Sequence, residues 1–187
     1  MNKSEKGMRL NMKKKNTLPL ILVLGLPIIL VVSNFIARLH INILETPLYL
    51  SAVIYPLTYL CTCLIIKKTS SKQAIYLMAL ALGAQSLSCV IQWIMLGDVD
   101  CSATLSTFIS FLLGQLIIIV GYDYLKKVKQ DNYFSILAII LLVSVLDNLI
   151  YGTIIEGLTI SLTFLVRLIY VVVIPLVIAN NNEKAKK

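Results

Sequence analysis

The composition of this 187-residue chain excludes an ordinary soluble domain, because 58% of its residues are hydrophobic and only 14% are charged. Soluble domains carry about 25% charged residues, so lipid is the expected solvent for most of the chain. The net charge of +8 does not indicate a nucleic-acid binder, since the basic residues form short clusters between apolar stretches instead of covering one face.

Six apolar stretches follow one another, each close to the length of about 20 residues that a helix needs to cross a bilayer. They run over Thr17–Ala37, Leu48–Ile66, Ala74–Leu96, Ala103–Leu125, Phe134–Ile155 and Leu158–Ala179. The sequence therefore predicts an all-α, polytopic membrane protein with six transmembrane helices in one domain, residues 17–179. A basic N-terminal tail, residues 1–16, and a basic C-terminal tail, residues 180–187, flank this domain. The first stretch is too long for a signal peptide and is expected to stay in the mature protein.

The lysine and arginine residues predict the orientation of the spans. Fifteen of the 17 lie in the two tails and in the loops after the second and fourth stretches. Arg38 lies in a loop on the opposite side, and Arg167 lies inside the sixth stretch. The positive-inside rule then places both termini in the cytoplasm and the chain in the plasma membrane, the inner membrane of the cell, as a multi-pass protein.

No signature of an enzyme is recognisable in the sequence. The four cysteines, Cys61, Cys63, Cys89 and Cys101, have neither the spacing of a zinc site nor that of a redox pair, and we interpret them as small apolar side chains. We find no nucleophile–base set, no phosphate-binding loop and no cluster of metal ligands. The sequence therefore predicts a protein without catalytic activity, resident metal or cofactor.

Polar side chains recur at helical spacing in four of the six stretches. They are Gln85, Ser88 and Gln92 in the third; Thr107, Ser110, Gly114 and Gln115 in the fourth; Ser144, Asp147, Asn148 and Tyr151 in the fifth; and Thr159, Thr163, Arg167 and Tyr170 in the sixth. The simplest packing turns these four faces toward a common interior. Because small and hydroxyl residues also help membrane helices to pack, the serines and threonines alone do not indicate a binding site.

Asp147 and Arg167 carry more information, because a charge at the centre of a span costs about 2.5–3.5 kcal/mol on insertion scales. Each lies ten residues from Gly157, in the turn between the last two stretches, and so about 15 Å deep at ~1.5 Å per residue. We expect the two side chains to pair near the bilayer midplane. The pair either only staples the last hairpin or contacts a solute or a coupling proton.

The second interpretation is favoured because three further polar faces surround the same depth, where transporters bind their solutes. The side chains of these faces complete a set of candidate solute-binding residues. The set is Asp147, Arg167, Asn148, Tyr151, Gln115, Gln85 and Gln92.

The run Tyr55-Pro56-Leu57-Thr58-Tyr59, followed by Lys72-Gln73-Ala74, resembles the second span and loop of the queuosine-precursor transporters, a family of vitamin uptake transporters. Further similar elements are Asn34 with Ala37, Gly114–Ile117, Ser144–Asp147 with Tyr151, Arg167 and Pro175. The resemblance implies uptake of a 7-deazaguanine such as 7-cyano-7-deazaguanine, or of queuine. It also adds Asn34 and Thr58 to the candidate substrate-binding residues.

The chain departs from the family pattern at four positions. Cys63, Lys67, Ser70 and Ile118 stand where the family carries an acid, a glutamate, a glycine and an aspartate. Among the acids that the family places in its spans, only Asp147 is kept. The resemblance therefore describes a divergent member, which either concentrates the work of these acids on Asp147 or handles a different solute.

Three functions are compatible with the sequence. The first is a secondary transporter, such as a proton symporter, that imports a queuosine precursor or a similar heterocycle. The second is the substrate-binding membrane subunit of an ATP-driven vitamin uptake complex, and the third is a membrane scaffold that transports nothing. The expected partners are a small-molecule solute and the lipid bilayer, without nucleic acid, and the sequence leaves open whether the chain forms homo-oligomers.

Overall fold

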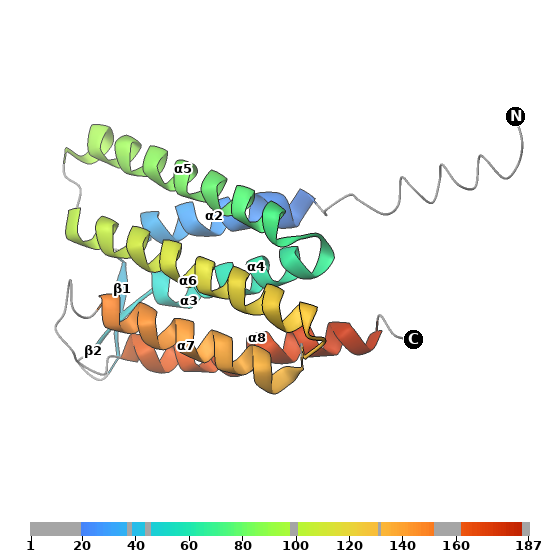
Figure 1. Cartoon of the computed structure of the whole chain (residues 1–187). Helices are drawn as coiled ribbons and strands as arrows, with labels where there is room; N and C mark the ends of the chain where they lie inside the picture. The colour runs from blue at the N-terminus through green and yellow to red at the C-terminus, as the bar shows by residue number, and fades with distance from the viewer. Residues whose placement is uncertain are drawn as a thin grey trace, which may run out of the picture.

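The computed structural model describes residues 20–36, 39–43, 46–97, 101–130, 132–151 and 162–184. These residues form a helical bundle (Figure 1), whose six longer helices have 12 to 27 residues. The longer helices are α2 (Leu20–Phe35), α4 (Leu57–Lys68), α5 (Ser71–Leu96), α6 (Cys101–Lys127), α7 (Tyr133–Tyr151) and α8 (Leu162–Lys184). The described helices confirm the predicted helical class and five of the predicted helical stretches.

Three described helices are long and apolar enough to cross a membrane. They are α5 over Ser71–Met95, α6 over Thr104–Lys127 and α7 over Tyr133–Ile150. Shorter apolar segments lie in α2, over Leu22–Phe35, and in α8, over Leu165–Asn180. The structure is therefore that of a membrane protein by the length and composition of its helices.

The second predicted span, Leu48–Ile66, is not one helix, and this prediction was wrong. The segment begins in strand β2 (Thr46–Tyr49), continues in the short helix α3 (Ser51–Ile54), and turns at Tyr55-Pro56 into α4. Proline has no N–H group and its ring clashes with the preceding turn, so Pro56 interrupts the helix. By contrast, Pro27 and Pro175 lie inside continuous helices.

The segment that precedes α3 contains a β-hairpin that the sequence did not predict. Strand β1 (His40–Ile43) pairs with β2 in antiparallel register, with His40 opposite Tyr49 and Ile43 opposite Thr46. Pro47 is tolerated because it lies in a two-stranded sheet, where each strand has a free edge. We call this end of the bundle the hairpin end.

The opposite end of the bundle, which we call the basic end, holds residues 67–73 and 126–130. The described termini of the bundle, Leu20 and Lys184, also lie at this end (Figure 1). Lysine side chains tie the helices together here: Lys126 Nζ donates to the Ile66 carbonyl of α4 at 2.9 Å, and Lys67 Nζ donates to the Ile178 carbonyl of α8 at 3.0 Å. Cations are favourable at the C-terminus of a helix, where carbonyl groups lack partners.

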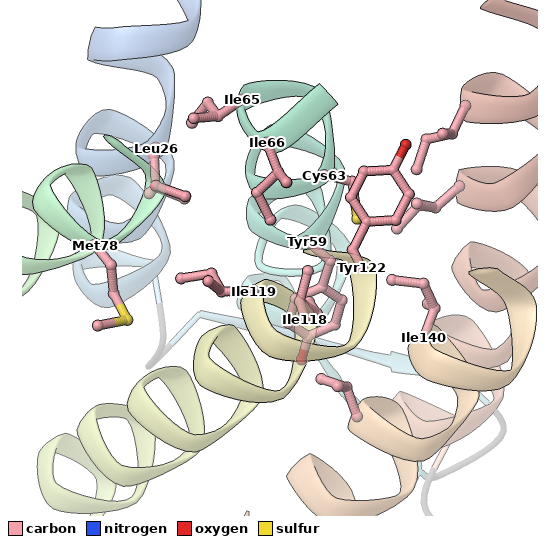
Figure 2. Packing of buried hydrophobic residues seen from close by; sticks show 14 of the residues in the cluster. Leu26, Tyr59, Cys63, Ile65, Ile66, Met78, Ile118, Ile119, Tyr122 and Ile140 are labelled. Atoms are coloured by element: carbon pink, nitrogen blue, oxygen red, sulfur yellow. The ribbon is translucent and has the colours of Figure 1, made fainter. Parts of the chain in front are cut away.

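Helix α4 is the central element, in contact with α2, α5, α6 and α8. Its buried residues are Thr58, Tyr59, Thr62, Cys63, Ile65 and Ile66. Toward the basic end these side chains pack against apolar residues of α6 and α7. Figure 2 shows this packing, with Ile118, Ile119 and Tyr122 of α6 and Ile140 of α7 around α4.

Helices α6 and α7 approach closely at two glycines of α6. A Cβ atom on Gly114 would lie 3.1 Å from Val143 Cγ1, and one on Gly121 would lie 2.9 Å from Ile139 Cδ1. Small residues of this kind allow helix backbones in membranes to come together. Gly83 on α5, in contrast, has no heavy atom within 4 Å of its Cβ position.

We expect Gly121→Leu to destabilise the bundle by about 1–3 kcal/mol, because the new side chain must push α7 away from α6. Gly83→Leu is the matched control and should change stability by no more than about 0.5 kcal/mol. Unfolding of both variants in mixed detergent micelles measures the difference. Equal losses in the two variants would contradict the close approach at Gly121.

Candidate functional site

Asp147 of α7 and Arg167 of α8 form an ion pair in the interior. Arg167 Nη1 lies 3.2 Å from Asp147 Oδ2, and the side chains are 7% and 2% exposed, respectively. A buried charge is strongly unfavourable unless an opposite charge and hydrogen bonds accompany it. The predicted pairing of these two residues is therefore confirmed.

The depth of the pair follows from the packing of α7 against α6. Val143 lies one helical turn before Asp147 and contacts Gly114, the middle residue of α6. One turn of helix rises about 5.4 Å. Asp147 thus lies about one turn from the midpoint of α6, toward the hairpin end.

Two tyrosines complete the surroundings of the ion pair. The Tyr59 hydroxyl of α4 donates to Asp147 Oδ2 at 2.6 Å, and Arg167 Cζ lies 6.0 Å from the ring centroid of Tyr55. The two tyrosine rings meet edge to face, with centroids 5.7 Å apart. Asp147 Oδ2 therefore accepts from the Tyr59 hydroxyl and pairs with the guanidinium, which lies over an aromatic face.

The ion pair lines a small cavity of about 20 Å³, which has room for about one water molecule. The lining residues come from α2, α3, α6, α7, α8 and the turn before α4: Ser33, Ser51, Tyr55, Thr107, Ser110, Asp147 and Arg167. Apart from the Tyr55 ring, every one of these side chains is polar or charged. The cavity is therefore a hydrogen-bonding compartment within an apolar bundle.

Several lining atoms have no hydrogen-bond partner among the described residues. They are Asp147 Oδ1, Ser33 Oγ, Ser110 Oγ and the Tyr55 hydroxyl, and each is buried. A buried polar atom without a partner costs about 1–3 kcal/mol. A polar molecule in the cavity would find hydrogen-bond partners in these atoms.

The predicted polar faces turn inward, but they do not all reach this cavity. Ser144, Gln85, Ser88, Ser110 and Gln115 are all buried. Helices α6, α7 and α8 contribute lining residues, whereas α5 contributes none of those at the cavity. Sequence periodicity indicates which face of a helix is buried but not which neighbour it meets, and a contribution of α5 to a solute-binding site stays a prediction.

Instead, the polar residues of α5 contact α2. Asn34 Nδ2 donates to Ser88 Oγ at 3.0 Å and lies 3.5 Å from Cys89 Sγ. The Gln85 amide is fully buried, and neither of its polar atoms has a partner among the described residues. Asn34 and Gln85 therefore lie in the α2–α5 part of the interior, away from the lining of the cavity.

The remaining predicted residues occupy different places. Thr58 is buried and donates its hydroxyl to the Tyr55 carbonyl at 2.7 Å, which also accepts from the Thr58 amide at 3.0 Å. Gln115 is buried and accepts from Thr62. Asn148 and Gln92 are half-buried and are not lining residues of the cavity. Tyr151 ends α7, but its side chain, like those of Thr159 and Thr163, lies outside the described residues.

Sequence reasoning missed Tyr55, Tyr59, Ser33 and Ser51 as members of the site. The two tyrosines stand four residues apart in the run around Pro56, which gives one signal that could have found them. The two serines are brought to the cavity by α2 and α3. No spacing within the sequence connects them to Asp147.

Comparison with protein-family models, with curated proteins and with solved structures finds no match for this chain. The chemistry of the site is nevertheless defined by its geometry. The cavity presents a carboxylate as acceptor, a guanidinium as donor, hydroxyl groups that do both, and an aromatic ring. This set can both donate hydrogen bonds to and accept them from a polar molecule.

The ion pair generates a stability prediction. We expect Asp147→Leu and Arg167→Leu each to destabilise the protein by about 3–5 kcal/mol, because each leaves the other charge buried without its partner. The double variant should lose clearly less than the sum, and unfolding in mixed detergent micelles measures all three. Leu142→Ala, at an exposed position of α7, is the control. Losses that add to within about 0.5 kcal/mol would show that the pair is not coupled.

Proposed function

We propose that this protein is a six-span carrier in the plasma membrane that imports a small polar heterocycle through the cavity at Asp147 and Arg167. The observation that carries the proposal is the buried ion pair facing a polar cavity near the middle of the helices. Ionisable residues inside membrane segments are rare, and those that face an internal cavity are characteristic of solute or ion pathways.

In the proposed topology α2, α5, α6, α7 and α8 each cross the membrane, and β2, α3 and α4 together make the remaining span. Helix α4 alone has 12 residues and is about 18 Å long, so it needs the preceding segment to cross. Broken helices are tolerated in membranes where they are buried in protein or line a cavity. The lysines at the basic end support a cytoplasmic position for that end and for both termini.

The proposed solute carries a guanine-like edge. Asp147 Oδ1, which has no partner among the described residues, is placed to accept from ring and exocyclic N–H groups. Arg167 is placed to donate to a neighbouring carbonyl, and the Tyr55 ring offers a surface for stacking. The resemblance of the Tyr55–Tyr59 run to the queuosine-precursor transporters supports 7-cyano-7-deazaguanine or queuine as this solute.

The cavity must widen before it admits such a molecule. Its volume of about 20 Å³ is far below the roughly 300–1,000 Å³ of ordinary ligand pockets. In the proposed cycle a wider state binds the solute, and the described state is the closed one.

We expect Asp147→Asn to abolish uptake of the precursor in cells that cannot make it, because the amide carries no charge and has an NH₂ donor in place of one acceptor oxygen. Asp123→Asn is the matched control: this acid lies at the basic end, paired with Lys127 at 2.7 Å, and its change should leave uptake unchanged. Membrane content of both variants is measured by immunoblot. Uptake by Asp147→Asn at the wild-type rate would overturn the proposal.

Reconstitution separates the carrier from its two rivals. Purified protein in liposomes without ATP should accumulate 7-cyano-7-deazaguanine or queuine, and an imposed proton gradient should increase the rate. Binding without uptake would favour a subunit of an ATP-driven complex. Neither binding nor uptake, across a panel of 7-deazaguanines, purines and water-soluble vitamins, would favour a scaffold.

The proposed topology predicts the labelling of introduced cysteines by a membrane-impermeant maleimide. Asn42→Cys in the exposed part of β1 should react in intact cells, because the hairpin end faces outward. Gln130→Cys, exposed in the turn between α6 and α7, should react only after the cells are permeabilised. The reverse pattern would invert the orientation, and reaction of both sites in intact cells would exclude six spans of this arrangement.

A further inference from the structure

Immediately beyond the cavity, toward the basic end, lies a second group of buried polar atoms. Gln115 is fully buried, and its Oε1 accepts from the Thr62 hydroxyl at 2.5 Å. Its Nε2 has no hydrogen-bond partner among the described residues. Turning the amide by 180° would leave the oxygen without a partner in place of the nitrogen. One end of this side chain therefore keeps an unused hydrogen-bonding atom.

Tyr59 separates this group from the cavity. Its ring lies against α6, because a Cβ on Gly114, the neighbour of Gln115, would be 3.8 Å from Tyr59 Cε1. Its hydroxyl is held by Asp147 on the cavity side. Along the chain, Tyr55 lines the cavity, Tyr59 follows about one turn later, and Thr62 lies about 10 Å beyond Tyr55 at 1.5 Å per residue.

Beyond Gln115 the interior is apolar. Cys63 of α4 is 1% exposed, and Ile118 of α6 and Ile140 of α7 are fully buried. Figure 2 shows these side chains packed together with Tyr59 and Tyr122. The polar amide of Gln115 therefore lies in a layer between the cavity and a tightly packed apolar region.

We propose that the Gln115 amide is a second binding position for the transported solute, and that the Tyr59 side chain is the gate between it and the cavity. This inference rests on the proposed function and deepens it. Solute N–H groups that reach both carboxylate oxygens of Asp147 bind Oδ1, which has no partner among the described residues, and compete with the Tyr59 hydroxyl for Oδ2. Once released, the Tyr59 ring is free to leave Gly114, and a carbonyl or ring nitrogen of the solute can accept from Gln115. Thr62 positions that amide.

A structural role alone accounts less well for this arrangement. If Gln115 served only to join α6 to α4, its bond to Thr62 would suffice, and a fully buried amide end without a partner would remain as a cost. Likewise, an apolar ring at position 59 would pack on Gly114 equally well. The hydroxyl is needed only for the contact with Asp147.

The gate is tested with the native Cys63, which lies one turn beyond Tyr59. In a variant whose other three cysteines are replaced by serine, Tyr59→Phe keeps the ring but removes its bond to Asp147. We expect Cys63 to react with N-ethylmaleimide about tenfold faster, the equivalent of one hydrogen bond to a charged group. Tyr170→Phe is the matched control, since its hydroxyl donates to the Val53 carbonyl near the hairpin end, and it should leave the rate unchanged.

Two further results decide the gate. Adding 7-cyano-7-deazaguanine to the protein with Tyr59 intact should raise Cys63 reactivity, and this measurement does not depend on the folding of a variant. An unchanged rate in Tyr59→Phe together with an unchanged rate on adding solute would overturn the gate.

The second binding position is tested by comparing Gln115→Leu with Thr62→Val. Both remove the Thr62–Gln115 hydrogen bond, but only the first removes the amide. We expect Gln115→Leu to slow uptake at saturating solute about tenfold while equilibrium binding of the solute stays within about twofold, and Thr62→Val to have a smaller effect on uptake. Equal slowing of uptake in the two variants would show that Gln115 only joins α6 to α4 through Thr62, and would contradict the second binding position. If the wild-type protein takes up no solute, both the proposed function and the second binding position are contradicted. Labelling of Cys63 in Tyr59→Phe would then still show whether Tyr59 acts as a gate.

Discussion

Burial of the Asp147 carboxylate is the constraint on which the rest of the structure depends. In an apolar interior a single charge is tolerated only with a partner and with hydrogen bonds to its remaining lone pairs. Arg167 supplies the charge from α8, and Tyr59 supplies a hydroxyl from α4. One side chain of α7 thereby fixes the position of two further helices, and the polar lining of the cavity collects around the same point.

The break at Pro56 makes this arrangement sterically feasible. A continuous helix over residues 48–66 would continue the backbone hydrogen bonds through Tyr55 and leave no turn at the cavity. Instead the carbonyls at the turn have internal donors: the Tyr55 carbonyl accepts from the Thr58 amide and hydroxyl, and the Val53 carbonyl accepts from the Tyr170 hydroxyl of α8. Irregular backbone in a membrane protein requires such internal partners. Tyr55 and Tyr59, four residues apart, approach the ion pair from the same short segment.

The helices α5 to α8 could be predicted from the sequence because the features that define them are local. Each has a long apolar run, and charged residues or capping residues lie within a few positions of its ends. Gly97 ends α5 in the left-handed conformation, and Asn132 Oδ1 accepts from the Ser135 amide at the start of α7. The Asp147–Arg167 pair was also predictable, because both residues can be counted from one turn. Ser33 and Ser51 were not, since their place at the cavity depends on how α2 and α3 pack against distant helices. The contact of the polar face of α5 with α2 could not be predicted for the same reason.

The interior is asymmetric along the bundle axis. Near the hairpin end, the ion pair and the polar side chains around it leave a small cavity between the helices. Toward the basic end, isoleucines and Tyr122 interdigitate around α4 (Figure 2). Lys126 and Lys67 hold α4 at that end through backbone carbonyls. For the proposed carrier, the described state is therefore closed toward the basic end by packing and by two lysine contacts. Opening that end requires α4 to move, and the Tyr55–Pro56 turn lies at the end of α4 opposite these contacts.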